Sequence, residues 1–79
     1  MSNLDKYKEA FSLCFGIPEE EVEGLKMKGI PAWDSVGHMG LISQIEGAFE
    51  IQMEPDDMID LVSYENGKEI LAAKYGVEF

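Results

Sequence analysis

Hydrophobic residues recur at intervals of three and four along much of the chain, which predicts helices and no strands. The first such segment is residues 3–15. Its apolar positions share one helical face: Leu4, Tyr7, Phe11, Cys14 and Phe15. Asn3 is the expected N-cap. Gly16 can take the left-handed conformation that ends a helix and Pro18 cannot continue one, so we expect this helix to end near Phe15.

A long connection is expected over residues 16–34, because it holds two prolines, three glycines and the acidic run 19–21. The segment "PEEEV" can form one helical turn with its acids at the positive end. The connection also carries five apolar residues: Ile17, Val22, Leu25, Met27 and Ile30. We therefore expect it to be ordered and to pack across the domain.

Asp34 is the expected N-cap of a second helix, "SVGHMGLISQIEGAFEI". Its core stripe follows helical spacing: His38, Leu41, Ile42, Ile45 and Phe49. The opposite side is small and nearly uncharged. Glycine inside a helix costs about 1 kcal/mol relative to alanine, so Gly37, Gly40 and Gly47 require a compensating reason.

One reason is that another protein lies on this opposite side, which would form a flat apolar contact surface. The predicted partner-binding residues are Val36, Met39, Gly40, Ser43, Glu46 and Gly47. The alternative is that this side packs against the long connection and the glycines permit a close backbone approach. We favour the partner surface.

Two further helices are predicted. A short one begins at Pro55, has two acids in its first turn and buries Met58, Ile59 and Leu61. Ser63 caps the last helix, which ends at Gly76. Its apolar stripe contains Tyr64, Ile70, Leu71 and Tyr75. The predicted fold is all-α: a four-helix bundle in a single domain, residues 1–79, with three main helices, a short third helix and a long loop between helices 1 and 2.

The charge of the chain limits its partners. Sixteen acidic residues against six basic ones give a net charge of −10, which repels nucleic acids and anionic membrane surfaces and attracts basic protein surfaces. No segment approaches the roughly 20 apolar residues of a membrane span. Cys14 is the only cysteine, which excludes an internal disulfide and fits a reducing compartment. We expect a monomeric cytoplasmic protein.

Ser35 opens the second helix and is the residue of greatest chemical interest. A nucleophilic serine needs a base within reach, and the only histidine, His38, is turned by the helix toward the core. There is no Gly-x-Ser-x-Gly motif, no metal-ligand spacing and no intact EF-hand loop. Hydrolase and metal chemistry are therefore disfavoured. An exposed serine at a helix start can instead be a covalent attachment point for a phosphodiester, which the helix dipole favours.

The segment "AWDSVGHMGLISQIEGAFEIQMEPDD" resembles the centre of acyl carrier proteins, in which an Asp-Ser-Leu motif begins the second of four helices. "FGIPEEEV" and "SYENGKEIL" are similar to other parts of that family. The resemblance implies that Ser35, flanked by the motif residues Asp34 and Val36, carries a 4'-phosphopantetheine arm with acyl groups bound as thioesters. It implies a carrier, not an enzyme. Its partners would be a phosphopantetheinyl transferase and the acyl-loading, acyl-transfer or condensing enzymes of a fatty acid, lipid or polyketide-type pathway.

Several features depart from the family. Gly37, Gly40 and Gly47 stand where fatty acid carriers often have acids, which implies a dedicated pathway. Gly67 replaces an apolar core residue, and either opens space for a cargo chain or is covered by Tyr64 and Tyr75. Trp33 anchors the loop on the core or meets a partner, and we favour the core.

Two alternatives remain. An aminoacyl or peptidyl carrier, including a D-alanyl carrier, shares the serine and the helix order, although peptidyl carriers usually have a pair such as Gly-Gly where this chain has Ala32-Trp33. A protein-interaction module could keep the fold without being modified. The methionine at residue 1, followed almost at once by a helix, suggests a stand-alone protein and not a piece of a synthase.

Overall fold

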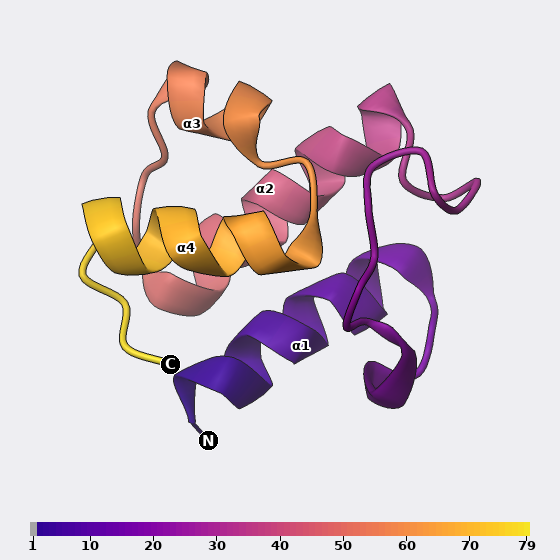
Figure 1. Cartoon of the computed structure of the whole chain (residues 1–79), viewed down its shortest axis with the longest axis horizontal. Coiled ribbons are helices and arrows are strands. Elements are labelled where there is room, and N and C mark those ends of the chain that lie inside the picture. The colour runs from indigo at the N-terminus through magenta and orange to yellow at the C-terminus, as the bar shows by residue number, and fades with distance from the viewer. Residues whose placement is uncertain (1) are drawn as a thin grey trace.

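Over residues 2–79 the chain forms four helices that pack together (Figure 1). Aromatic and aliphatic side chains form one core among them. The computed structural model describes residues 2–79, so Met1, the first residue of the predicted domain, lies outside the description. The helices are α1 (Asn3–Phe15), α2 (Ser35–Phe49), α3 (Pro55–Asp60) and α4 (Tyr64–Lys74), and a 3-10 turn (Glu19–Glu21) follows α1. No strand occurs over residues 2–79. The all-α prediction, with a short third helix and a long first loop, is confirmed.

Local capping rules account for most helix ends. Asp34 caps α2, Pro55 opens α3, and Ser63 forms a capping box with Asn66 at the start of α4. Gly16 ends α1 in the left-handed conformation. The α2 helix stops two residues earlier than predicted, because Glu50 turns into the left-handed region with φ of 54°.

The predicted cap of α1 is wrong by one residue. Ser2 is the N-cap, because its hydroxyl accepts a hydrogen bond from the Asp5 amide while the Asp5 carboxylate accepts one from the Ser2 amide. Asn3 is the first helical residue. Its side-chain amide donates to the carbonyl oxygen of Glu78 at 2.9 Å, which fastens the C-terminal segment beside the start of α1 (Figure 1).

The core is centred on a cluster of aromatic rings from α1, the long loop and α4. Phe11 makes edge contacts with Tyr7, Trp33 and Tyr64 at centroid distances of 4.9, 5.4 and 5.3 Å. Trp33 is completely buried, so the prediction that it anchors the loop on the core is confirmed. Val22 is also buried in the core, and the other apolar loop residues are partly buried against it: Ile17, Leu25, Met27 and Ile30. The loop is therefore an ordered layer of the domain.

Gly67 is buried where α4 crosses α1, and the sequence-based alternatives for it are both wrong. A Cβ atom at Gly67 would collide with the Tyr7 hydroxyl and approach the Leu61 side chain to 3.2 Å. Tyr7 and Leu61, and neither Tyr64 nor Tyr75, fill the space. The Tyr7 hydroxyl donates to the carbonyl oxygen of Tyr64 at 2.6 Å, which holds α1 against the first turn of α4. No room for a cargo chain opens at this position.

The short α3 helix is fixed by a buried charged residue as well as by apolar ones. Leu61 is buried and Met58 is partly buried, as predicted, but Ile59 is 72% exposed, so its predicted burial is wrong. Asp57, which was not predicted to be buried, is buried. The Asp57 carboxylate accepts hydrogen bonds from Lys74 Nζ at 2.7 Å and from the Tyr75 hydroxyl at 2.6 Å. The hydrogen bond from Lys74, followed by that from Tyr75, lowers the pKa of Asp57 below its ordinary value. This pair of contacts ties α3 to the end of α4.

Candidate functional site

Ser35 is the first residue of α2 and is exposed. The preceding Asp34 takes an extended conformation, and its Oδ1 accepts a hydrogen bond from the Gly37 amide at 2.8 Å. The Ser35 hydroxyl forms no hydrogen bond with any residue in the described range 2–79. The helix start is thus held by its neighbours, and the serine oxygen is left free at the surface.

His38 follows one turn later, and its side chain is buried. It is 7% exposed and stacks on the Trp33 ring at a centroid distance of 6.3 Å. The Trp33 indole Nε1 donates to His38 Nδ1 at 3.0 Å. Because an indole nitrogen can only donate, Nδ1 must be the acceptor and the ring proton lies on Nε2. Nε2 donates that proton to the carbonyl oxygen of Met58 at 2.6 Å.

Both ring nitrogens of His38 are therefore used inside the fold, and neither can take a proton from Ser35. This confirms the prediction that His38 belongs to the core stripe of α2. Leu41, Ile42 and Ile45 complete the buried part of that stripe, and Phe49 is partly buried at its end. The histidine links three elements, because Trp33 belongs to the long loop and Met58 to α3.

The last part of the long loop is tightly turned and packs closely against the start of α2. The Lys28 amide donates to the Trp33 carbonyl at 2.8 Å, and the Trp33 amide donates to Ile30 at 3.1 Å. A Cβ atom at Gly37 would collide with the carbonyl oxygen of Ala32. The close approach of this loop therefore explains why residue 37 is a glycine. For Gly37, this is the alternative considered above, in which the glycines of α2 permit close packing against the long connection. The tight loop fixes where Ser35 emerges.

Gly40 and Gly47 have different surroundings from Gly37. A Cβ atom at Gly40 would lie 3.4 Å from the Cys14 sulfur of α1, whereas one at Gly47 would meet nothing within 4 Å. Cys14 is partly buried, and burial raises the pKa of its thiol. The close approach of Cys14 in α1 is therefore one reason why residue 40 is a glycine. No such contact explains why residue 47 is a glycine.

The predicted partner surface lies open to solvent. Val36 is 82% exposed and Met39 55% exposed, and three smaller residues beside them are also exposed: Gly40, Ser43 and Gly47. Glu46 differs, because it is half-buried and its Oε2 accepts a hydrogen bond from the Met53 amide at 2.9 Å. Its carboxylate therefore holds the segment after α2, in addition to any role at the surface.

Two exposed apolar residues near α3 were not identified from the sequence. Ile59 is 72% and Val62 46% exposed. Because Met58 accepts the hydrogen bond from His38, α3 is held against the first half of α2, which brings Ile59 into the neighbourhood of that helix. A six-residue helix can bury only one narrow face. Because Met58 and Ile59 are adjacent, this face cannot include both, and that was the one indication in the sequence that Ile59 is exposed.

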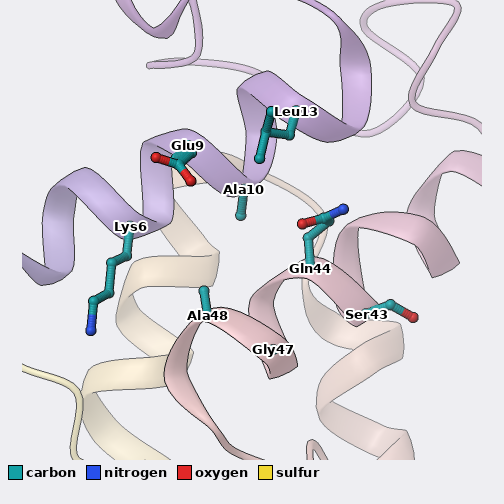
Figure 2. A pocket seen from close by; sticks show the side chains of 8 residues that line it. All are labelled: Lys6, Glu9, Ala10, Leu13, Ser43, Gln44, Gly47 and Ala48. Atoms are coloured by element: carbon teal, nitrogen blue, oxygen red, sulfur yellow. The ribbon is translucent and has the colours of Figure 1, made fainter.

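A groove between α1 and α2 is a second feature that sequence reasoning missed (Figure 2). Its volume is about 390 Å³. The residues that line it are Lys6, Glu9, Ala10 and Leu13 from α1, and Ser43, Gln44, Gly47 and Ala48 from α2. Each helix supplies half of the lining. Neither half is a recognisable motif, so only the pairing of the helices reveals the groove.

Within residues 2–79, no three side chains of His, Cys, Asp or Glu gather where they could hold a metal ion. Over the same residues, every helix is too short or too polar to cross a membrane.

Comparisons with known proteins do not assign the chain to a family. No protein-family model matches it, and searches of the curated proteins and of the solved structures found no match. Function is therefore inferred from Ser35, from the face of α2 below it and from the contacts that hold both in place.

Proposed function

We propose that the chain is an acyl carrier protein that takes a 4'-phosphopantetheine arm on Ser35 and presents acyl groups to partner enzymes. One observation carries the proposal: Ser35 is exposed at the start of α2, while the single histidine that could activate it is committed to Trp33 and Met58. Such a serine is suited to be modified by another enzyme and unsuited to perform catalysis itself. The chain is then a substrate and a carrier, not an enzyme.

The residues around Ser35 suit a phosphodiester. The amide groups of the first turn of a helix lack partners inside the helix, and they carry the positive end of its dipole. Asp34 uses one carboxylate oxygen to cap the Gly37 amide, so the amides of Ser35 and Val36 remain to face an anion. In loading, the Ser35 oxygen forms a bond to the phosphorus that bears pantetheine in coenzyme A. The bond from that phosphorus to adenosine 3',5'-bisphosphate breaks, and a base of the transferase takes the hydroxyl proton.

When bound, the arm supplies a terminal thiol that carries the cargo as a thioester. The chain's own residues have simpler tasks. Asp34 keeps the helix start in place, the buried Trp33 and His38 fix the loop before it, and the exposed serine gives the arm freedom to move. Cys14 is partly buried and its Sγ donates to the carbonyl oxygen of Gly37 at 3.4 Å, so the proposal places the cargo on the thiol of the arm and not on Cys14.

The surface around Ser35 supports recognition by dedicated enzymes. Val36 and Met39 offer apolar contact area beside the serine, and the net charge of −10 attracts partners with basic surfaces. The partners would be a phosphopantetheinyl transferase and the acyl-loading, acyl-transfer or condensing enzymes of a cytoplasmic fatty acid, lipid or polyketide-type pathway. The carrier itself would be a monomer. Aminoacyl or peptidyl cargo, including D-alanine, is the alternative within the same mechanism.

A second candidate function is an unmodified protein-interaction module. The 82% exposure of Val36, together with the exposed Met39, favours it, because apolar side chains that gather on a surface often mark a protein contact. Such a module would use the face of α2 without the serine oxygen. The two functions therefore differ in whether Ser35 is chemically required.

Loading with coenzyme A and a phosphopantetheinyl transferase separates the two candidates. We expect the wild-type chain to gain the mass of one phosphopantetheine and Ser35→Ala to gain none while keeping its helical circular dichroism. Glu69→Ala is the control, because Glu69 is exposed on α4, outside the proposed partner surface, and its replacement should not affect loading. Unmodified wild-type protein, under conditions that load a known carrier, would favour the interaction module.

A further inference from the structure

The exposed side of α2 connects Ser35 to the groove between α1 and α2. Residues four apart form one row along a helix, and Ser35, Met39, Ser43 and Gly47 have that spacing. All four are exposed, and Ser43 and Gly47 also line the groove. We infer that the arm on Ser35 follows this row and rests its thioester end, with a short acyl cargo, in the groove. This inference rests on the proposed carrier function.

The length of the arm matches the path. A helix rises 1.5 Å per residue, so Ser43 lies about 12 Å and Gly47 about 18 Å from Ser35 along the axis. The arm has the chain length of roughly four to five amino-acid residues, which spans about 15 Å when extended. Its thiol therefore reaches the near end of the groove, at Ser43, and an acyl group on the thiol would extend from there toward Gly47.

The lining of the groove suits the end of such an arm. In Figure 2, Ala10 of α1 and Ala48 of α2 point toward each other across the gap, and Leu13 stands above Gln44. Leu13 is 64% exposed, so its side chain is available for contact. Ser43 and Gln44 offer hydrogen-bonding groups for the amides of the arm. The volume of about 390 Å³ is at the lower end of the range of about 300–1,000 Å³ for ligand pockets.

The interior of the domain offers no comparable place at Gly67, the position where the core could have opened. Tyr7 and Leu61 occupy that space, and the Tyr7 hydroxyl is held by its hydrogen bond to Tyr64. Gly47, in contrast, has open space above it and no packing reason to be glycine. An absent side chain at Gly47 keeps the groove open, so the cargo class that fits is a short acyl group at the surface.

The test compares apo protein with protein loaded with phosphopantetheine and with a short acyl-phosphopantetheine, by backbone amide NMR and intact mass. We expect shifts at Ala10, Leu13 and Gln44 on loading. The variant Gly47→Leu should fill the groove and remove these shifts, because Gly47 lines the groove and a Cβ atom there meets nothing within 4 Å, so the added side chain can be attached without a backbone clash. The control Ala73→Leu adds the same side chain to an exposed position of α4 and should leave the shifts unchanged.

The outcomes separate this inference from the function on which it rests. A mass gain together with groove shifts that Gly47→Leu alone removes supports both. A mass gain without shifts at the groove, or with shifts that survive Gly47→Leu, overturns the groove as the resting place and leaves the carrier function standing. No mass gain on the wild-type chain overturns both.

Discussion

The indole nitrogen of Trp33 donates a hydrogen bond to Nδ1 of His38 at 3.0 Å, and both side chains are buried. The contact fixes the last residues of the long loop against α2, one residue before the Asp34 cap. Through Nε2, the same histidine holds the carbonyl oxygen of Met58 at 2.6 Å. The single histidine of the chain is therefore a structural link beneath Ser35 and not its base.

Replacing His38 with alanine should destabilise the protein without making Ser35 unreactive to a transferase. The change leaves the Trp33 N–H and the Met58 carbonyl without their partner and opens a cavity, which should cost about 2–4 kcal/mol of unfolding free energy. Urea denaturation measures the loss, and Met39→Ala, an exposed neighbour, should stay within about 0.5 kcal/mol of wild type. A stable, folded His38→Ala protein that no longer accepts the arm would contradict the structural role.

Replacing Gly67 or Gly47 with alanine should change the stability of the protein in opposite directions. Gly67→Ala places a Cβ against the Tyr7 hydroxyl and Leu61, and overpacking of about 1–3 kcal/mol should exceed the helix-propensity gain of about 1 kcal/mol. Gly47→Ala meets no atoms, so it should stabilise the protein by up to about 1 kcal/mol. Thermal and urea unfolding of the two variants checks both signs. Stabilisation by Gly67→Ala would mean that Tyr7 does not fill this position.

Removing the two buried tyrosine hydroxyls, those of Tyr7 and Tyr64, should have different effects on stability. The Tyr7 hydroxyl donates to Tyr64, so Tyr7→Phe should lose about 0.5–1.5 kcal/mol. The Tyr64 hydroxyl is buried without a partner in the described range 2–79, and burial, with smaller effects from Glu23 and Glu65, raises its pKa to about 12. Tyr64→Phe should therefore be neutral or stabilising. A loss for Tyr64→Phe as large as that for Tyr7→Phe would show that a water molecule or another group satisfies this hydroxyl.

The contact between α3 and α4 should weaken in acid. The hydrogen bond from Lys74, then that from Tyr75, lowers the pKa of Asp57 in the folded state. Its contribution is therefore present above the ordinary aspartate pKa of about 3.9, and it is lost as pH falls through the lower folded value. The stability difference between wild type and Asp57→Asn, measured by urea unfolding, should be constant near neutral pH and shrink below about pH 4. A difference unchanged down to pH 2 would contradict this assignment.

Sequence reasoning succeeded where the cause is local. Asp34, Gly16 and Pro55 act within one helical turn of their own positions, so the ends that they set could be predicted from their neighbours. The inward turn of His38 followed from the helical period alone. The cap of α1 was missed because Ser2 and Asn3 are both good caps, and the reciprocal bond with Asp5 decides between them.

The failures arise from contacts between distant residues. Tyr7 fills the space at Gly67, which is 60 positions away in the chain. Asp57 is buried because Lys74 and Tyr75 reach it from α4, so its place in the first turn of a short helix gave no indication of this role. The groove beside Gly47 exists only because α1 and α2 pack together. The exposure of Ser35 depends on how the loop before it packs, which the sequence did not show.

The most direct test of the carrier account is the site of modification. Wild-type protein incubated with coenzyme A and a phosphopantetheinyl transferase is measured as an intact mass and then fragmented. We predict one added phosphopantetheine, located on Ser35 and on no other serine, including the exposed Ser43. Protein that gains no mass while a known carrier is loaded in parallel, or that carries the group at a different residue, would contradict the account.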